Sequence, residues 1–296
     1  MDRVIPAIPT LFSEDGEVAC DCYGGIFSWL RENGVGNAAI HMIGGEYYKL
    51  ADHERVLTAR HIARTFGTSF SIYVNVSASS YNSSLRIMGA LAGYKVSGYV
   101  VNSPVQSPLR SEEERVYDIS MKIIERSGAP FILQVYGSVP QGSTLEGMLR
   151  TGRICALKVE ASLGEERRIA DLLSSRVPLL SGRFGSSFIE ELAMGFHGCM
   201  PDPLSAPFLM RALDLHLSGR DRDAREVLSV LSVYHSLLLQ HFDSFPYLVR
   251  EAMAGAGIIE RAGFREPTVV PDRATVERAR SEGYRLVKAA DSLTRS

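Results

Sequence analysis

A lysine that ends a short apolar segment is the residue whose position most favours covalent chemistry. Lys158 follows Ile154-Cys155-Ala156-Leu157, and this segment lies between Thr151-Gly152 and Glu160-Ala161-Ser162. Four apolar residues bounded in this way are typical of a buried strand. An ammonium group there loses solvation, and it either gives up its proton or reaches solvent along its own stem. A neutral amine attacks carbonyl carbons, so Lys158 is a candidate for forming a Schiff base, and an ordinary strand-end lysine is the alternative.

Two further pairs of residues lie where other apolar segments end. Gly44 and Gly45 can leave backbone N–H groups open to a carboxylate, although a simple tight turn is equally consistent with this pair. Gln134 and Tyr136 are two residues apart and therefore share one face of an extended chain. Either of them can hydrogen-bond a substrate carbonyl or hydroxyl, so both are candidate catalytic residues.

A glycine-flanked arginine indicates a site for an anion. Gly182 and Arg183 follow the apolar segment 177–181 and precede the start of a helix. Helix N-termini and the last loops of α/β barrels commonly bind carboxylate or phosphate groups. A surface arginine beside a capping serine is an equally good interpretation.

Metal chemistry has weaker support in the sequence. His41 and His197 lie near the ends of predicted strands, but no HxH or HExxH motif and no cluster of carboxylates accompanies them. We therefore expect neither a metal site nor a cofactor. A metal-dependent aldolase that uses these two histidines is the weakest alternative.

The elements that must position these residues alternate between strands and helices. Eight apolar or β-branched segments recur at intervals typical of βα units: residues 4–8, 38–42, 70–76, 98–101, 131–135, 154–158, 177–181 and 198–200. No GxGxxG motif follows the first segment, which argues against a dinucleotide-binding fold. The pattern predicts an α/β fold, a (β/α)8 TIM barrel over residues 1–220 whose active site is built at the C-terminal ends of the strands.

Helical segments without strands follow the barrel. The predicted helices cover residues 206–217, 222–240, 245–256 and 274–290. We predict a C-terminal helical extension over residues 221–296 that closes one end of the barrel or makes oligomer contacts.

Composition limits the classes of partner. The net charge of −2 indicates no basic surface for nucleic acid. Hydrophobic residues make up 45% of the chain, but no apolar segment is long enough to span a membrane. The four cysteines form no CxxC pair, and we expect them to be reduced in a cytoplasmic protein. A small molecule is the expected partner.

Several motifs together resemble a known family. They are IPAIPTLFSEDGEV at the start, Gly44-Gly45-Glu46 followed by LADHER, the lysine in ALKVEAS, and the LLSG that ends at Gly182. In order and spacing they are similar to the dihydrodipicolinate synthase and N-acetylneuraminate lyase family, over about residues 5–240. The resemblance implies a barrel enzyme, usually a tetramer, in which Lys158 forms a Schiff base with pyruvate or another 2-keto acid.

The chain also departs from the pattern of this family. Hydroxyl side chains that bind the keto-acid carboxylate are replaced by Ile43 and Gly44, and the family's proton-relay tyrosine aligns with Gln134. Val105-Gln106 stands where the family has a pair of tyrosines, and no arginine for a second carboxylate follows the segment 131–135. A phenol can relay a proton and an amide cannot, so Tyr136 would have to substitute from a bulged strand end. These changes argue against true dihydrodipicolinate synthase activity and give little support to sialic acid cleavage.

The main functional hypothesis is a class I aldolase or dehydratase acting on a 2-keto acid and an aldehyde or sugar-acid partner. Lys158 would be the nucleophile, Gln134 or Tyr136 would bond the substrate oxygens, and Gly44 and Gly45 would orient the carboxylate. Gly182 and Arg183 would bind the distal end of the substrate. A catalytically impaired barrel that binds or senses a small acid is the alternative, and a homo-oligomer, dimer or tetramer, is expected in both cases.

Overall fold

Seven parallel strands form one sheet in the order of the sequence. The computed structural model describes residues 3–78, 80–102, 113–136, 139 and 142–293. Each strand pairs with the next, so the order β1-β2-β3-β4-β5-β6-β7 has no crossover. The strands are β1 (Asn37–Ile40), β2 (Ser71–Asn75), β3 (Gly98–Asn102), β4 (Phe131–Tyr136), β5 (Ile154–Glu160), β6 (Leu179–Ser181) and β7 (Gly198–Cys199).

The N-terminal segment 4–8 closes the sheet into a barrel. Val4 makes a parallel bridge to Cys199 of β7, and Ala7 makes one to Ala39 of β1. The Ile5 N–H donates to the Cys199 carbonyl at 3.0 Å, and the Ala39 N–H donates to the Pro6 carbonyl at 2.8 Å. The prediction of a parallel α/β barrel is confirmed, but the first of the eight predicted strands is reduced to isolated bridges. Pro6 and Pro9 explain the difference, because proline has no N–H to donate to a sheet ladder.

The interior of the barrel is filled by one side chain from nearly every strand. This cluster contains Ile5, Ala39, Met42, Tyr73, Val100, Ile132, Ala156, Leu180 and Met200. Neighbouring residues such as Leu133, Leu157 and Val159 instead belong to the larger core between the sheet and the helices. Because side chains alternate across a strand, Ile132, Gln134 and Tyr136 share the interior face of β4. By the same rule Ala156, Lys158 and Glu160 share the interior face of β5.

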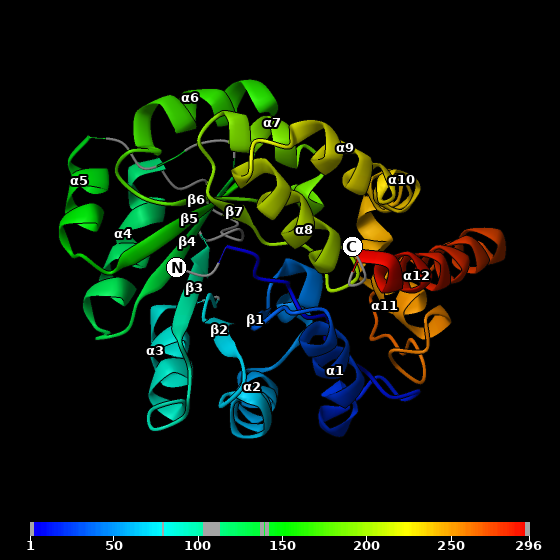
Figure 1. Cartoon of the computed structure of the whole chain (residues 1–296). Coiled ribbons are helices and arrows are strands. Elements are labelled where there is room, and N and C mark those ends of the chain that lie inside the picture. The colour runs from blue at the N-terminus through cyan, green and yellow to red at the C-terminus, as the bar shows by residue number, and fades with distance from the viewer. Residues whose placement is uncertain (1–2, 79, 103–112, 137–138, 140–141, 294–296) are drawn as a thin grey trace.

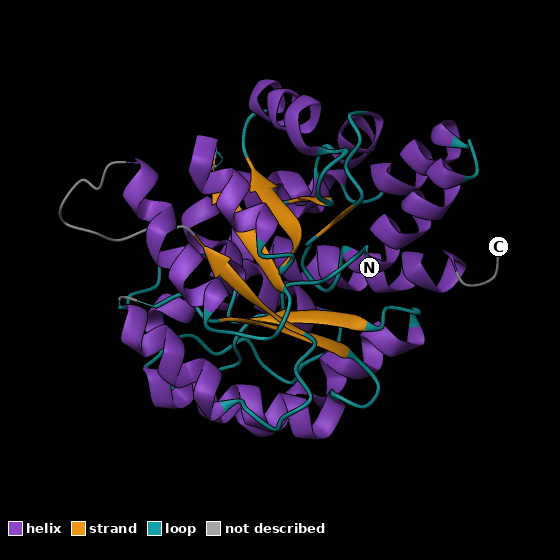
Figure 2. Ribbon diagram, turned by 90° about the vertical axis from the view of Figure 1, so that its left-hand side faces the viewer, coloured by secondary structure: helices purple, strands orange, loops and turns teal. Residues whose placement is uncertain are grey.

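Helices surround the strands on the outside of the barrel (Figure 2). The α-helices of this layer are α1 (Gly24–Glu32), α2 (Asp52–Phe66), α3 (Tyr81–Ala90), α4 (Glu113–Glu125), α5 (Gly142–Arg150), α6 (Leu163–Leu173), α7 (Phe188–Ala193) and α8 (Ala206–Leu217). Short 3-10 turns are η1 (Cys20–Tyr23), η2 (Ile43–Gly45), η3 (Tyr47–Lys49) and η4 (Arg183–Gly185). Turns η2 and η4 follow β1 and β6, and both contribute to the site described below.

The chain ends in helices that lie together beside the barrel (Figure 1). They are α9 (Asp221–Ser229), α10 (Ser232–Gln240), the turn η5 (Phe242–Ser244), α11 (Phe245–Gly255) and α12 (Arg273–Leu293). The predicted single helix over 222–240 is therefore two helices. Ser229 bonds back to the Glu226 carbonyl at 2.7 Å, a contact that bends or ends helices. The boundary at residue 220 falls between α8 and α9 and stays a prediction.

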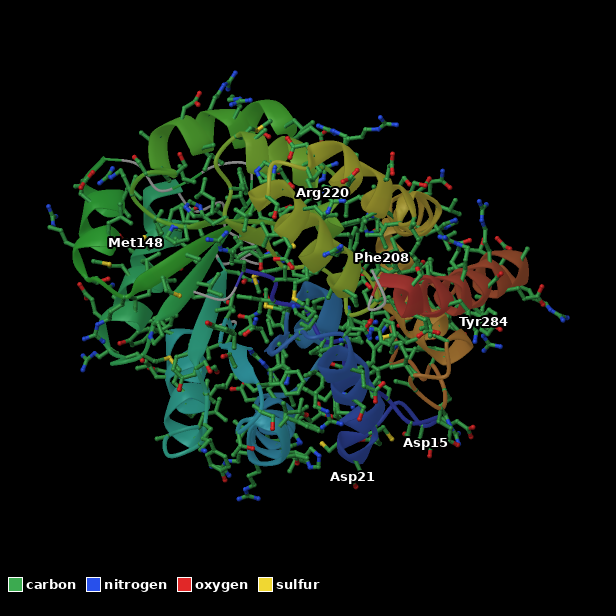
Figure 3. All side chains as sticks on the ribbon, in the orientation of Figure 1. Asp15, Asp21, Met148, Phe208, Arg220 and Tyr284 are labelled. Atoms are coloured by element: carbon green, nitrogen blue, oxygen red, sulfur yellow. The ribbon has the colours of Figure 1, made fainter. Side chains whose placement is uncertain are left out.

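Charged side chains lie both at the surface and in the interior of the molecule. Figure 3 shows Asp15 and Asp21 at the edge of the molecule, and Phe208 of α8, which is fully buried, between the ribbons. Within the described part of the chain, no helix has both the length and the apolar character needed to span a lipid bilayer.

A buried carboxyl group makes the stability of the fold depend on pH. Glu191 of α7 is 2% exposed, and burial raises its pKa to about 8 from an ordinary 4.5. Between these two pH values the folded chain binds a proton that the unfolded chain has released, so this group's contribution to stability falls as pH rises. We expect Glu191→Gln to remove this fall. The check is the free energy of urea unfolding of both proteins, measured near pH 5 and near pH 8. If the difference between the wild type and the variant is the same at both pH values, the assignment is contradicted.

Candidate active site

A pocket of about 210 Å³ opens at the C-terminal ends of the strands. Its walls come from the segments that follow β1, β6 and β7, from the last residues of β4 and β5, and from the helical extension. They include Ala7, Met42, Ile43, Gly44, Tyr136, Lys158, Glu160, Arg183, Phe184, Met200, Pro201, Asp202, Phe242, Phe245 and Val249. Four of the seven site residues predicted from the sequence line it: Gly44, Tyr136, Lys158 and Arg183.

Lys158 lies at the bottom of this pocket beside a carboxylate. Its side chain is 6% exposed, and its Nζ lies 2.7 Å from Oε1 of Glu160. The two residues are two positions apart on β5, so both point into the barrel. The amine is therefore oriented and partnered inside the pocket instead of extending into solvent, and the adjacent carboxylate can accept a proton from it.

Gln134 and Tyr136 reach the site from the neighbouring strand. In the register of β4 and β5, Gln134 is opposite Lys158 and Tyr136 is opposite Glu160. Gln134 is fully buried, and its Nε2 donates to Glu160 Oε1 at 3.0 Å. It does not line the pocket and instead holds the carboxylate that does.

Tyr136 enters the pocket from a regular strand end. The register of β4 and β5 shifts only between Phe131 and Ile132, so the bulge that would let Tyr136 take the place of the family's tyrosine is absent from the described strand. Its hydroxyl is buried and has no hydrogen-bond partner among the described residues. Burial, and secondarily the charge of Glu160, raises the pKa of Tyr136 well above its ordinary value. The phenol therefore keeps its proton and is available as a donor to a substrate oxygen.

Gly182 packs against Glu160 and does not line the pocket. A Cβ at this position would lie 2.2 Å from Cγ of Glu160 and 2.8 Å from the Val159 carbonyl oxygen. The absence of a side chain after β6 is what leaves room for the glutamate. The role of Gly182 in substrate binding stays a prediction, and the structure shows that its backbone contacts Glu160.

The turn after β1 presents one glycine to the pocket. Gly44 lines it, whereas the Gly45 N–H donates to the Met42 carbonyl at 2.9 Å. The Thr10 hydroxyl donates to the Gly45 carbonyl at 2.5 Å. The expectation that both N–H groups are open to a carboxylate is wrong for Gly45, because this residue closes the turn itself.

An ion-pair network fixes this turn to the C-terminal extension. Glu46 has a left-handed backbone with φ 52°, and its carboxylate binds the Arg250 guanidinium of α11 and Lys49 Nζ, the latter at 2.6 Å. Arg250 is fully buried, and its guanidinium also lies 5.3 Å from the centre of the Phe12 ring. The position of Gly44 therefore depends on a helix more than 200 residues away in sequence.

Arg183 lies at the mouth of the pocket on a strained turn. Arg183 and Phe184 have φ of 45° and 63°, values that residues with bulky side chains rarely adopt. The Arg183 guanidinium donates to the Ala161 carbonyl at 3.0 Å and remains exposed. Such strain persists where surrounding structure enforces it, commonly at binding sites.

The two histidines considered for a metal lie at opposite ends of the barrel. His41 follows β1 at its C-terminal end, and His197 precedes β7 and contacts the start of β6, where the Leu179 N–H donates to its Nδ1 at 3.3 Å. Because the strands are parallel, these two rings cannot share one metal ion. No cluster of three potential metal ligands occurs among the residues that the structure describes.

Comparison with known families identifies the chain. The model of the Dihydrodipicolinate synthetase family matches residues 1–282 of the 296. The chain belongs to this family. A comparison with curated protein sequences gives no match.

Solved structures related to the Dihydrodipicolinate synthetase family share the fold at low sequence identity. Dihydrodipicolinate synthase from Rhodopseudomonas palustris is 18% identical, with a TM-score of 0.83 over 96% of this chain and 97% of that one. The 4-hydroxy-tetrahydrodipicolinate synthase of Methylacidiphilum fumariolicum SolV is 17% identical, with a TM-score of 0.85 over 99% of both chains. A catalytic-lysine mutant of Ruminococcus gnavus sialic acid aldolase is 12% identical, with a TM-score of 0.87 over 99% of this chain and 97% of that one. At these identities the likeness shows the fold alone.

Three features of this family member's site were missed from the sequence. Glu160 could have been found, because the rule that pairs Gln134 with Tyr136 also pairs it with Lys158. Phe242 and Phe245 carry no such signal, since only the packing of the helical extension brings them to the pocket.

Val105-Gln106, where the sequence departs from the family's tyrosine pair, lies outside the described residues.

Proposed function

We propose that this protein is a class I lyase, an aldolase or dehydratase, in which Lys158 forms a Schiff base with pyruvate or a related 2-keto acid. The observation that carries the proposal is the primary amine at the bottom of the pocket, 6% exposed and 2.7 Å from a carboxylate. The iminium that forms withdraws electrons from C3 of the keto acid, so that a bond to C3 can be made or broken.

The remaining polar groups suit a 2-keto acid. Gly44 presents backbone to the pocket, where the substrate carboxylate would lie, and the Tyr136 hydroxyl has a free proton to donate to a substrate oxygen. The Arg183 guanidinium at the mouth would meet the distal end of a longer substrate. The 2-keto acid would thus be held at one end and exposed to its partner at the other.

The departures from the family's pattern argue for a substrate other than that of the synthases. Ile43 and Gly44 supply no side-chain hydroxyl for the carboxylate, and Gln134 is buried beneath Glu160 where the family has a tyrosine. Gln134 also motivates the second candidate, a barrel that binds a small acid without turnover, because an amide does not relay protons.

Trapping the Schiff base separates the two candidates. The protein is incubated with pyruvate and sodium borohydride, which reduces an imine to a stable secondary amine, and its intact mass is measured. We expect a single pyruvyl adduct, equally in Lys95→Ala, a control that removes an exposed lysine of the loop before β3. No adduct with pyruvate or with longer 2-keto acids would contradict the lyase, and a ligand that raises the melting temperature without being consumed would then favour the binding protein.

A further inference from the structure

Three contacts and its place on β5 fix the side chain of Glu160 against the reactive amine. Its Oε1 is 2.7 Å from Lys158 Nζ and 3.0 Å from Gln134 Nε2. Its Cγ occupies the space that a Cβ on Gly182 would take, and its position on β5 points it into the barrel. The side chain is 21% exposed, so it also faces the pocket. A carboxylate in this position touches both the nucleophile and the space for the substrate.

We propose that Glu160 is the acid–base catalyst of this site and performs the proton transfers that Gln134 cannot. This inference rests on the proposed lyase function. The titratable or charged groups that line the pocket with Glu160 are Lys158, Tyr136, Arg183 and Asp202. Asp202 accepts from the backbone of Leu204 and from the Ser205 and Tyr234 hydroxyls, so its carboxylate is already engaged. Tyr136 keeps its proton beside Glu160, which leaves Glu160 as the proton acceptor in contact with Lys158.

Each proton in the reaction then has a place to go. The Lys158 ammonium gives a proton to Glu160, and the free amine adds to C2 of the keto acid to form a carbinolamine, with its second proton moving to the carbonyl oxygen. Glu160 returns its proton to that hydroxyl, which leaves as water and yields the iminium. In the addition direction Glu160 next takes a proton from C3, giving the enamine. The enamine adds to the aldehyde carbon, and Glu160 protonates the new alkoxide oxygen.

The test compares Glu160→Gln with a matched control, Glu260→Gln, whose side chain is 83% exposed at the surface. The rate of adduct formation with pyruvate and cyanoborohydride is followed from pH 6 to pH 9 for each protein. We expect Glu160→Gln to be slowed by ~10²-fold at neutral pH, the usual size of a general acid–base contribution, and to gain rate as pH rises because solvent must now remove the lysine proton. Added formate is expected to restore part of the rate in Glu160→Ala, where it can occupy the space of the missing carboxylate.

The results test the role of Glu160 separately from the proposed lyase function. Glu160 is not the catalyst if the wild type is trapped and Glu160→Gln reacts at the same rate. The same conclusion follows if Glu160→Gln is slowed equally at every pH and formate does not rescue Glu160→Ala. In both cases the proposed lyase function stands. If the wild type is not trapped, the lyase itself fails. Gly182→Ala gives a second measurement that leaves both catalytic groups intact. Its methyl group must displace Glu160, so a wild-type rate in this variant would count against the proposal.

Aromatic side chains form one wall of the pocket. Phe184 and Phe245 meet edge to face with ring centres 5.1 Å apart, and Phe242 lies 5.2 Å from Phe245. Val249, one turn further along α11, continues this surface. Phe242 is 53% exposed, an unusual position for a large apolar ring unless something covers it. Hydroxyl groups of a sugar acid would find no partners along these three rings.

We infer that this aromatic wall binds an apolar partner of the keto acid, an aryl aldehyde in preference to a polyhydroxylated one. This inference also rests on the proposed lyase function. Stacked or edge-to-face contact with aromatic rings stabilises an aryl group beyond its area burial. The left-handed backbone of Phe184 turns its ring into the pocket, which is consistent with strain held for binding.

The test measures pyruvate-dependent condensation with benzaldehyde and with glyceraldehyde. We expect kcat/KM to be at least ~10-fold higher for benzaldehyde, and this ratio to fall by about 10-fold in Phe242→Ser, as loss of apolar contact predicts. Leu172→Ser, at an equally exposed position on the outer face of α6, should leave the ratio unchanged. Equal use of both aldehydes, an unchanged ratio in Phe242→Ser, or no condensation by a protein that still traps pyruvate would overturn the inference.

Discussion

Lys158→Ala is expected to abolish the borohydride-trapped adduct and to reduce turnover of any 2-keto acid substrate by ~10³-fold or more, because a covalent nucleophile acts as a unit with its partners. Without the amine no iminium forms, and C3 of the keto acid has no electron sink. The fold should survive, since Glu160 keeps the amide of Gln134 as a hydrogen-bond donor and remains partly exposed to the pocket. The measurements are intact mass after reduction and steady-state turnover.

Two companion variants make this result specific. Lys158→Arg keeps a cation beside Glu160 but has no amine that forms a Schiff base, so it should be as inactive as Lys158→Ala. Lys95→Ala should behave as the wild type. If the alanine variant still gains the pyruvyl mass, another amine is the nucleophile and the assignment of Lys158 is wrong.

Glu46→Gln is expected to lower the free energy of unfolding by about 3–5 kcal/mol, the usual loss when one partner of a buried ion pair is removed. Arg250 is fully buried and its Nη1 binds Glu46, whereas its Nε and Nη2 have no hydrogen-bond partner among the described residues. A neutral amide would leave that cation buried without a counter-charge, with Lys49 beside it. Urea denaturation followed by circular dichroism measures the change.

An exposed ion pair of the same chemistry is the control. Glu190 pairs with Arg225 between α7 and α9, with side chains 44% and 56% exposed. Because solvent screens such a pair, Glu190→Gln should change the free energy of unfolding by less than about 1 kcal/mol. Similar losses in the two variants would show that the Glu46 network is no more than a surface contact. A loss confined to Glu46→Gln would show that the turn at Gly44 is held by the C-terminal extension.

Because side chains alternate between the two faces of a strand, much of the barrel and part of the site could be predicted from the sequence. Seven of the eight apolar segments are strands, and the lysine that ends one of them lies in the pocket at the expected end of the barrel. The failure over residues 4–8 is also local in origin, because Pro6 within the segment and Pro9 directly after it cannot donate to the ladder. Gln134 and Tyr136 share a face as their spacing predicts, since side-chain direction in a strand depends only on residue number.

The tertiary structure decided how these residues divide their roles. Pairing of β4 with β5 places Gln134 and Tyr136 next to Glu160, and Gly182 makes the space for that carboxylate. Packing of α11 brings Arg250 to Glu46 and Phe245 to the pocket wall, across about 200 residues in the first case. The sequence by itself determined the strands and the direction of Lys158, because periodicity is a local property. The carboxylate beside that lysine, Glu160, follows from the same local rule, because it lies two residues further along β5. Which aromatic rings and which helix border the pocket depends on contacts between distant segments, and these exist only once the barrel has closed and the C-terminal helices have packed against it.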